Sequence, residues 1–219
     1  MKQSILLFAL ALNYLTLSAQ SNPYQSAMEK AMVQIDSARG PADFQAAANT
    51  FARIAAAEPG QWLPPYYAAF CHLIGAFQLF QEDAPKALGT IDLAQASLDK
   101  AKALMPQESE INVMQAYVLI GRLMENPMAK GAEITPKVFA ELEQAAAMNP
   151  ANPRAPFLRG TYVLNMPEFY GGGAANALPY FEKAAGLFEK ESDRGLLPHW
   201  GKGTNAKYLE QLQQAGKGN

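Results

Sequence analysis

The chain has 219 residues, of which 18 are basic and 20 are acidic, giving a net charge of −2. This balance argues against a nucleic-acid partner, because nucleic-acid-binding proteins gather lysine and arginine into basic patches. Cys71 is the single cysteine, so an internal disulfide is impossible. The stability of the fold must therefore come from its core. The length suits one sizeable domain.

Residues 1–19 have the pattern of a secretory signal peptide. Lys2 supplies a positive start, residues 5–12 are apolar, and Ala19 ends a run of small residues that a signal peptidase can cut. The apolar run is shorter than the roughly 20 residues that span a bilayer, which disfavours the alternative of an uncleaved anchor. We therefore predict cleavage before Gln20 and a mature domain over 20–219 that is not inserted in a membrane.

Helix-forming residues dominate the rest of the chain. Alanine is abundant, and no long stretch shows the alternation of β-strands. Asp83 and Thr135 each precede the proline of a helical first turn, as N-caps do, and Ser109 and Thr204 are similar capping candidates. The sequence thus predicts an all-α domain. Its nine helices are expected near residues 24–38, 41–57, 64–81, 84–104, 109–125, 136–148, 154–165, 174–190 and 204–215.

Four of these helices share one spacing pattern. The first copy is Ala47, Phe51, Ile54 and Pro59, with intervals of 4, 3 and 5 residues. The later copies are Ala94, Leu98, Ala101 and Pro106, then Val138, Leu142, Ala145 and Pro150, and finally Ala177, Phe181, Ala184 and Glu189. A small residue stands ten positions after each of the three prolines, where the first helix of a pair would pack closely. These small residues are Ala69, Ala116 and Gly160.

The pattern resembles the second helix of the tetratricopeptide repeat (TPR). The resemblance covers residues 24–190 and implies a TPR-like right-handed α-solenoid of about four helix pairs. Residues 204–215 are apolar on one side and look like its C-terminal capping helix. The last frame position recurs after 47, 44 and 39 residues, whereas a TPR repeats every 34. The surplus falls between the two helices of each repeat, and in two repeats it is expected to form loops 126–134 and 167–173.

The resemblance also implies a binding surface on the concave side of the repeats. In TPRs, fixed positions of each first helix line this groove. The matching positions here include Tyr66, Phe70, Tyr117, Arg154, Phe157 and Thr161. An aromatic groove with an acid and an arginine at its rim suits an extended peptide or a partner helix. The alternative is that the lengthened helices bury these side chains against one another.

The stretch Tyr170-Gly171-Gly172-Gly173 is a possible ligand loop. Three glycines ahead of a helix could present free N–H groups to an anion. They could equally form a tight turn, which we favour because no lysine or arginine lies near them in sequence. Trp200 follows the last repeat and is a candidate to fold back near this loop. Such loops and Pro-x-Trp-Gly segments resemble those of exported TPR proteins of Gram-negative bacteria, so we expect a periplasmic or secreted location.

Motifs of catalysis are missing from the sequence, which contains no nucleophile elbow, zinc-protease motif or P-loop. Cys71 and His72 are adjacent, but on a helix their side chains point about 100° apart. We interpret Cys71 as a buried, inert residue. His72 and His199 cannot supply the four ligands of a structural zinc site on their own. We therefore predict no catalytic residue, no metal and no cofactor, and a protein that is not an enzyme.

Two functions follow from these observations. The first is an exported interaction module that binds a protein or peptide in the aromatic groove. The alternative is a small-ligand-binding accessory component of a periplasmic transport system. Its site would lie between the groove, the glycine loop and Trp200.

Overall fold

The computed structural model describes residues 22–217, so the predicted signal peptide lies outside the described residues. Over residues 22–217 the regular structure is helical, with no strand, which confirms the all-α class. No helix in this range is long and apolar enough to cross a membrane. The helices are α2 (Pro23–Ser37), α3 (Pro41–Ala57), α4 (Leu63–Leu79), α5 (Ala84–Leu104), α6 (Ser109–Leu123), α7 (Pro127–Met148), α8 (Arg154–Asn165), the 3-10 helix η2 (Glu168–Tyr170), α9 (Ala174–Lys190) and α10 (Lys202–Lys217).

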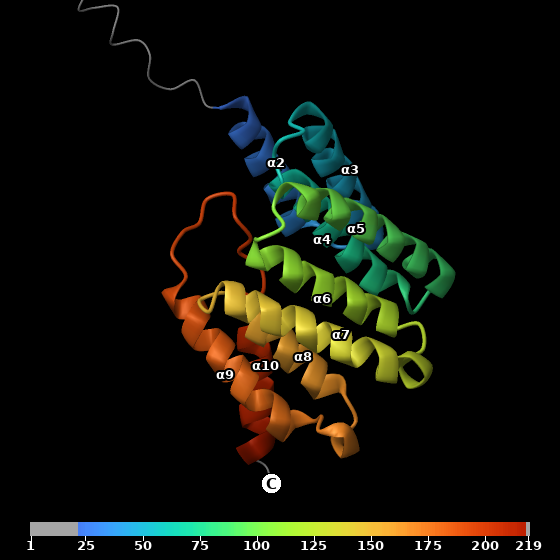
Figure 1. Cartoon of the computed structure of the whole chain (residues 1–219), viewed down its shortest axis with the longest axis vertical. Helices are drawn as coiled ribbons and strands as arrows, with labels where there is room; N and C mark the ends of the chain where they lie inside the picture. The colour runs from blue at the N-terminus through green and yellow to red at the C-terminus, as the bar shows by residue number, and fades with distance from the viewer. Residues whose placement is uncertain (1–21, 218–219) are drawn as a thin grey trace, which may run out of the picture.

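The helices form hairpins that lie side by side (Figure 1). Each α-helix packs against the next one in the chain, from α2 to α9, and α10 packs against α9. Between α9 and α10, residues 191–201 form a long irregular connection (Figure 1), and Leu196, Leu197 and Trp200 within it pack against the core. The first helices of three hairpins, α4, α6 and α8, also contact one another in that order. We call these three helices the inner layer.

The repeated spacing pattern marks the packing surface of the hairpins. The first three positions of all four copies are buried. The small residues of the inner layer are buried as well, and Gly160 shows why one of them is small. A Cβ atom at Gly160 would lie 3.1 Å from the ring of Phe181, which is fully buried in α9. The spacing therefore predicted the core correctly.

One predicted loop, 126–134, is wrong. The structure begins α7 at Pro127, and the side chain of Asn126 caps it by accepting a hydrogen bond of 3.0 Å from the amide of Ala129. Pro136 consequently lies inside the helix rather than at its start. Thr135 is not an N-cap, and its hydroxyl instead lies 2.6 Å from that of Tyr162. The surplus residues of this repeat lengthen a helix, because Asn126 and Pro127 already form a helix start ahead of them.

The other predicted caps have mixed outcomes. Asp83 is confirmed, since its carboxylate accepts a hydrogen bond of 3.0 Å from the amide of Lys86. Ser109 is the first residue of α6, and Glu108 takes the capping position. Thr204 lies within the first turn of α10, which begins at Lys202. The capping positions thus lie one residue before Ser109 and three before Thr204, and the order of elements is unchanged.

Candidate functional site

Trp200 fills the centre of the inner layer. Its ring stacks on Phe70 of α4 and on Tyr117 of α6, with centroid distances of 5.4 and 5.6 Å. It meets Phe157 of α8 edge-on at 6.3 Å. Its indole N–H donates a hydrogen bond of 3.0 Å to the hydroxyl of Tyr66. Four predicted groove residues from three helices thus converge on one side chain of the chain itself.

A buried ionic cluster fixes the segment that carries this tryptophan. Glu110 of α6 and Arg154 of α8 have fully buried side chains, and their charged groups lie 3.2 Å apart. Arg154 also donates hydrogen bonds of 2.8 and 3.1 Å to Glu191, which follows α9. Arg194 approaches Glu110 at 3.3 Å. Burial raises the pKa of Glu110, and the cations of Arg154 and Arg194 oppose that rise.

The C-terminal segment 191–201 therefore covers the middle of the predicted groove. Arg154 and Tyr66 have no exposed surface, and Phe70 and Phe157 are almost fully buried. Of the predicted groove residues, Tyr117 and Thr161 keep partial exposure. The sequence left open that the groove residues are buried against one another, and this is the case for Tyr66, Phe70, Arg154 and Phe157. The binding of a partner in the groove stays a prediction. The sequence did not indicate Glu191 and Arg194, because they lie in an irregular segment without periodicity.

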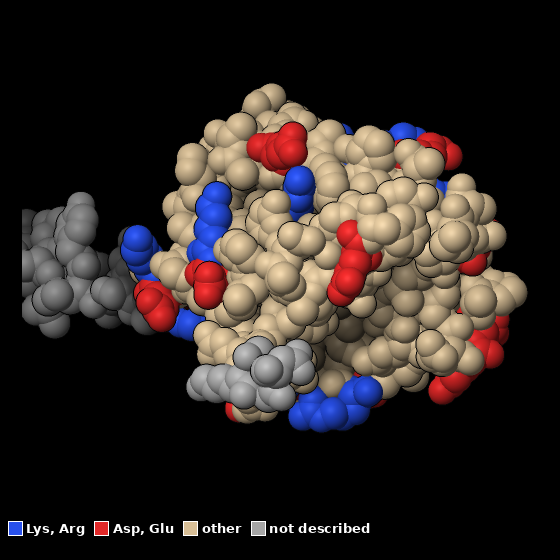
Figure 2. All heavy atoms as spheres, turned by 90° about the horizontal axis from the view of Figure 1, so that it is seen from below, with Lys and Arg blue, Asp and Glu red and all other residues tan. Residues whose placement is uncertain are grey.

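Several apolar side chains of the inner layer and of α10 remain half-buried, and one of them, Tyr117, contacts Trp200. These side chains are Phe77, Tyr117, Ile120, Leu164, Tyr208 and Leu212. Tyr117 packs against both core clusters of the protein, and its ring lies 5.1 Å from that of Phe77. Seen from below, the molecule is hollowed, and most of the residues around the hollow are uncharged (Figure 2). We call these six residues the apolar lining.

The glycine loop is a tight turn. The amide of Gly173 donates to the carbonyl of Val163 at 2.9 Å, and the amides of Gly171 and Gly172 donate to carbonyls within the loop. A Cβ atom on Gly172 would lie 1.8 Å from the carbonyl oxygen of Met166, so only glycine fits there. All three N–H groups are thus engaged within the protein, as in a turn, and a ligand at this loop stays a prediction.

The loop and Trp200 lie at opposite ends of α8. Trp200 contacts Phe157 in the first turn of the helix, whereas the loop follows its last residue, Asn165. A helix of this length separates its ends by roughly 15–18 Å. The structure thus does not bring the predicted ligand loop and Trp200 together. Next to the glycines, Phe169 and Tyr170 are exposed, with ring centroids 4.2 Å apart.

Cys71 has the environment expected for an inert thiol. It is fully buried, and burial raises its pKa to about 12. The thiolate that would act as a nucleophile is therefore scarce at neutral pH. Among the described residues, no cluster of three His, Cys, Asp or Glu side chains could hold a metal ion.

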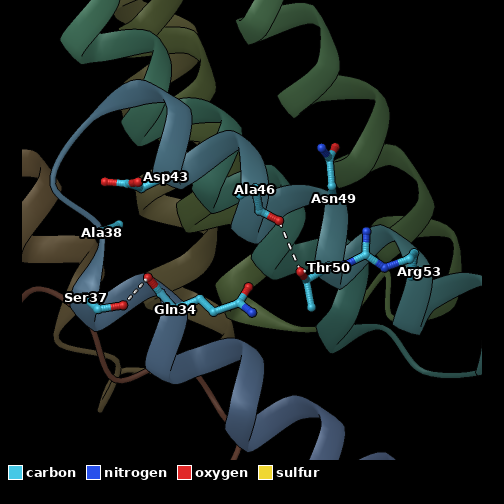
Figure 3. A pocket seen from close by; sticks show the side chains of 8 residues that line it. All are labelled: Gln34, Ser37, Ala38, Asp43, Ala46, Asn49, Thr50 and Arg53. Carbon is cyan, nitrogen blue, oxygen red and sulfur yellow. Dashed lines mark hydrogen bonds between the residues drawn. The ribbon is translucent and has the colours of Figure 1, made fainter.

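A polar hollow of about 420 Å³ lies between α2 and α3 (Figure 3). Its two hydroxyl groups are engaged within their own helices. The hydroxyl of Ser37 donates to the carbonyls of Val33 and Gln34, and that of Thr50 donates to the carbonyl of Ala46. With these groups already bonded, the apolar lining is the stronger candidate for a ligand site.

The fold and this face define an all-helical protein of stacked hairpins with an aromatic-rich inner surface. No family model matches the chain, and no curated protein matches it either. Among solved structures it is similar to the HusA haemophore from Porphyromonas gingivalis, with 31% identity, a TM-score of 0.77, and coverage of 90% of this chain and 96% of that one. The chain belongs to the family of this haemophore. Membership of the TPR family stays a prediction.

Proposed function

We propose that the chain is an exported binding protein for haem or a related porphyrin. Its relative HusA is a haemophore, and the likeness extends over 96% of that chain. A porphyrin is a large flat ring with apolar faces, so it requires an apolar surface with aromatic side chains.

The surroundings of Tyr117 support the position of the site. Its ring lies 5.1 Å from that of Phe77 and 5.6 Å from that of Trp200, yet it is only half-buried. Leu164 and Leu212 extend the half-buried apolar surface onto α8 and α10. Half-buried aromatic rings offer a flat ligand both stacking and apolar contact. We propose that the porphyrin ring lies against this apolar lining.

Titration with haemin, followed by its absorbance band, tests the proposal. Leu212→Gln places a polar group in the apolar lining and should weaken binding about tenfold, equivalent to 1.4 kcal/mol. The matched control is Leu93→Gln on α5, where the native side chain is 49% exposed. The control should bind as the parent does, and thermal melting should show both variants folded. Equal haemin affinity of the two variants would contradict binding at the apolar lining.

A protein or peptide partner in the groove is the second candidate. One observation favours it: the inner layer already holds an irregular segment, 191–201, through stacking and ion pairs. A partner would have to displace Trp200. A labelled peptide with the sequence of residues 190–201, followed by fluorescence anisotropy, tests this directly. Saturable binding would show that segment 191–201 can be displaced from the groove. Absence of binding would count against a peptide partner and leave the porphyrin proposal for this surface.

Export is part of the proposed function. The pattern of residues 1–19 supports it, as does the relationship to a haemophore. Intact-mass analysis of protein expressed in a bacterial host should give a chain that starts at Gln20. A product that retains Met1 would contradict cleavage.

A further inference from the structure

A second cavity lies on a different side of α4, between α3 and α5. Its volume is about 290 Å³, near the lower end of the roughly 300–1,000 Å³ of small-molecule sites. Cys71, His72, Gly75 and Leu79 of α4 line it. Their spacings of one to eight residues place them along one face of the helix. Phe70, which contacts Trp200, is two positions from His72 and therefore points to roughly the opposite side.

The walls of this cavity are mainly apolar. Gly75 lets α3 approach α4 closely at this wall, since a Cβ atom there would lie 3.3 Å from the Cβ of Phe44. Ala42 and Leu79 add further apolar surface. Cys71 behaves as a small apolar residue, because its thiol remains protonated. A ligand in this space would therefore require an apolar body.

One polar group in the lining is buried without a hydrogen-bond partner. His72 is only 8% exposed, and its Nδ1 is buried without a hydrogen bond. Such groups are uncommon in folded proteins and call for an explanation. Burial also lowers the pKa of His72, so its ring is neutral at neutral pH and can donate or accept a hydrogen bond.

Lys86, in the first turn of α5, is the one cation in the lining of this cavity. It is exposed, and no acidic residue of the described range forms a salt bridge with it. An exposed ammonium group beside an apolar cavity favours a ligand that is apolar at one end and anionic at the other.

We infer that the cavity between α3, α4 and α5 binds a small monocarboxylate with an apolar body of about ten non-hydrogen atoms. The apolar body lies against Gly75 and Leu79, and the carboxylate pairs with Lys86. The imidazole of His72 supplies a hydrogen-bonding group in the cavity wall. This site is separate from the apolar lining, so it does not depend on the porphyrin proposal.

The full-length mature protein and the probe 3-phenylpropanoate test this inference. The readout is the NMR signal of the His72 ring proton. Because the chain has 2 histidines, this signal has to be distinguished only from that of His199. The probe should shift the His72 signal saturably, with a Kd on the order of 1 mM for a ligand of this size. The signal of His199 should not move. Absence of a saturable shift at His72, or an equal shift at His199, would overturn the site.

Matched variants test the role of the charge. Lys86→Met should weaken the probe about tenfold, and the neutral analogue 3-phenylpropanol should lose a similar factor with the parent protein. Lys102→Met, at the other end of α5, is the control and should bind as the parent does. Ala42→Leu should fill the cavity and abolish the shift. Equal binding by the two lysine variants, or full binding by Ala42→Leu, would contradict the inference. Haemin is followed separately by absorbance, so either site can fail without the other.

Discussion

Arg154 reaches two carboxylates although its side chain has no exposed surface. Its guanidinium lies 3.2 Å from Glu110 and 2.8 Å from Glu191. Burying such charges costs free energy, which the ion pairs and hydrogen bonds offset only while every member is present. Removal of the guanidinium would leave Glu110 buried and without its main counter-charge.

We therefore expect Arg154→Met to lower the free energy of unfolding by about 3–5 kcal/mol at neutral pH. Arg122→Met is the matched control, because its partner Asp92 is 66% exposed. Such a surface pair is worth less than about 1 kcal/mol. Urea unfolding of both variants measures the difference. Equal losses would mean that the buried cluster does not fix segment 191–201 as described.

The loss caused by Arg154→Met should depend on pH. Burial already raises the pKa of Glu110, and removal of Arg154 takes away a cation that opposes the rise. A carboxyl group whose pKa is higher in the folded state binds its proton more tightly there, so acid favours the folded state. The deficit relative to the parent should shrink as pH falls through the pKa of Glu110. Urea unfolding at a series of pH values would contradict this if the deficit stayed constant or grew.

The boundaries of three helices were predicted from a capping residue or a glycine near a proline. The predicted ranges 41–57, 84–104 and 174–190 agree with α3, α5 and α9. The start of α7 carried the same signal, Asn126 followed by Pro127, but Pro136 was taken as the start instead. Local sequence cannot show that tertiary packing holds a helix together through an internal proline.

Pro136→Ala should stabilise the protein, because proline inside a helix removes a backbone hydrogen bond and is about 3 kcal/mol less favourable than alanine. Part of that cost is already relaxed in the native backbone, so we expect a gain of about 1–3 kcal/mol. The control Pro127→Ala lies in the first turn, where proline is tolerated, and should change little. Urea unfolding compares them. A Pro136→Ala protein no more stable than the control would show that α7 is shaped around this proline.

The last helix covers the end of the hairpin stack. Tyr208 stacks on Phe181 with a centroid distance of 5.0 Å, and the side-chain amide of Asn205 donates to the carbonyl of Phe181 at 3.1 Å. Truncation after residue 203 exposes Phe181 and should cost at least about 2 kcal/mol of stability. Truncation after Ala215 retains these contacts and is the control. If both truncated proteins unfold at the same urea concentration as the parent, α10 is not a cap.

At the scale of the whole molecule, the repeated spacing predicted the hairpins and their core. It reports which face of each helix is buried, so Phe51, Leu98 and Phe181 were found from sequence. It could not predict what covers the inner layer. Glu110 and Arg194 are 84 residues apart, and Trp200 lies in a segment without periodicity. A periodic pattern has no information about such long-range contacts.

The central proposal is that the apolar lining binds a porphyrin, and mapping the site by NMR tests it most directly. Amide signals of the mature protein would be compared with and without zinc protoporphyrin, which is diamagnetic. We predict that the largest shifts cluster around Tyr117, Leu164 and Leu212, which lie on α6, α8 and α10. Shifts confined to residues 167–173 or to the cavity at His72, or no shifts with excess ligand, would contradict the proposal.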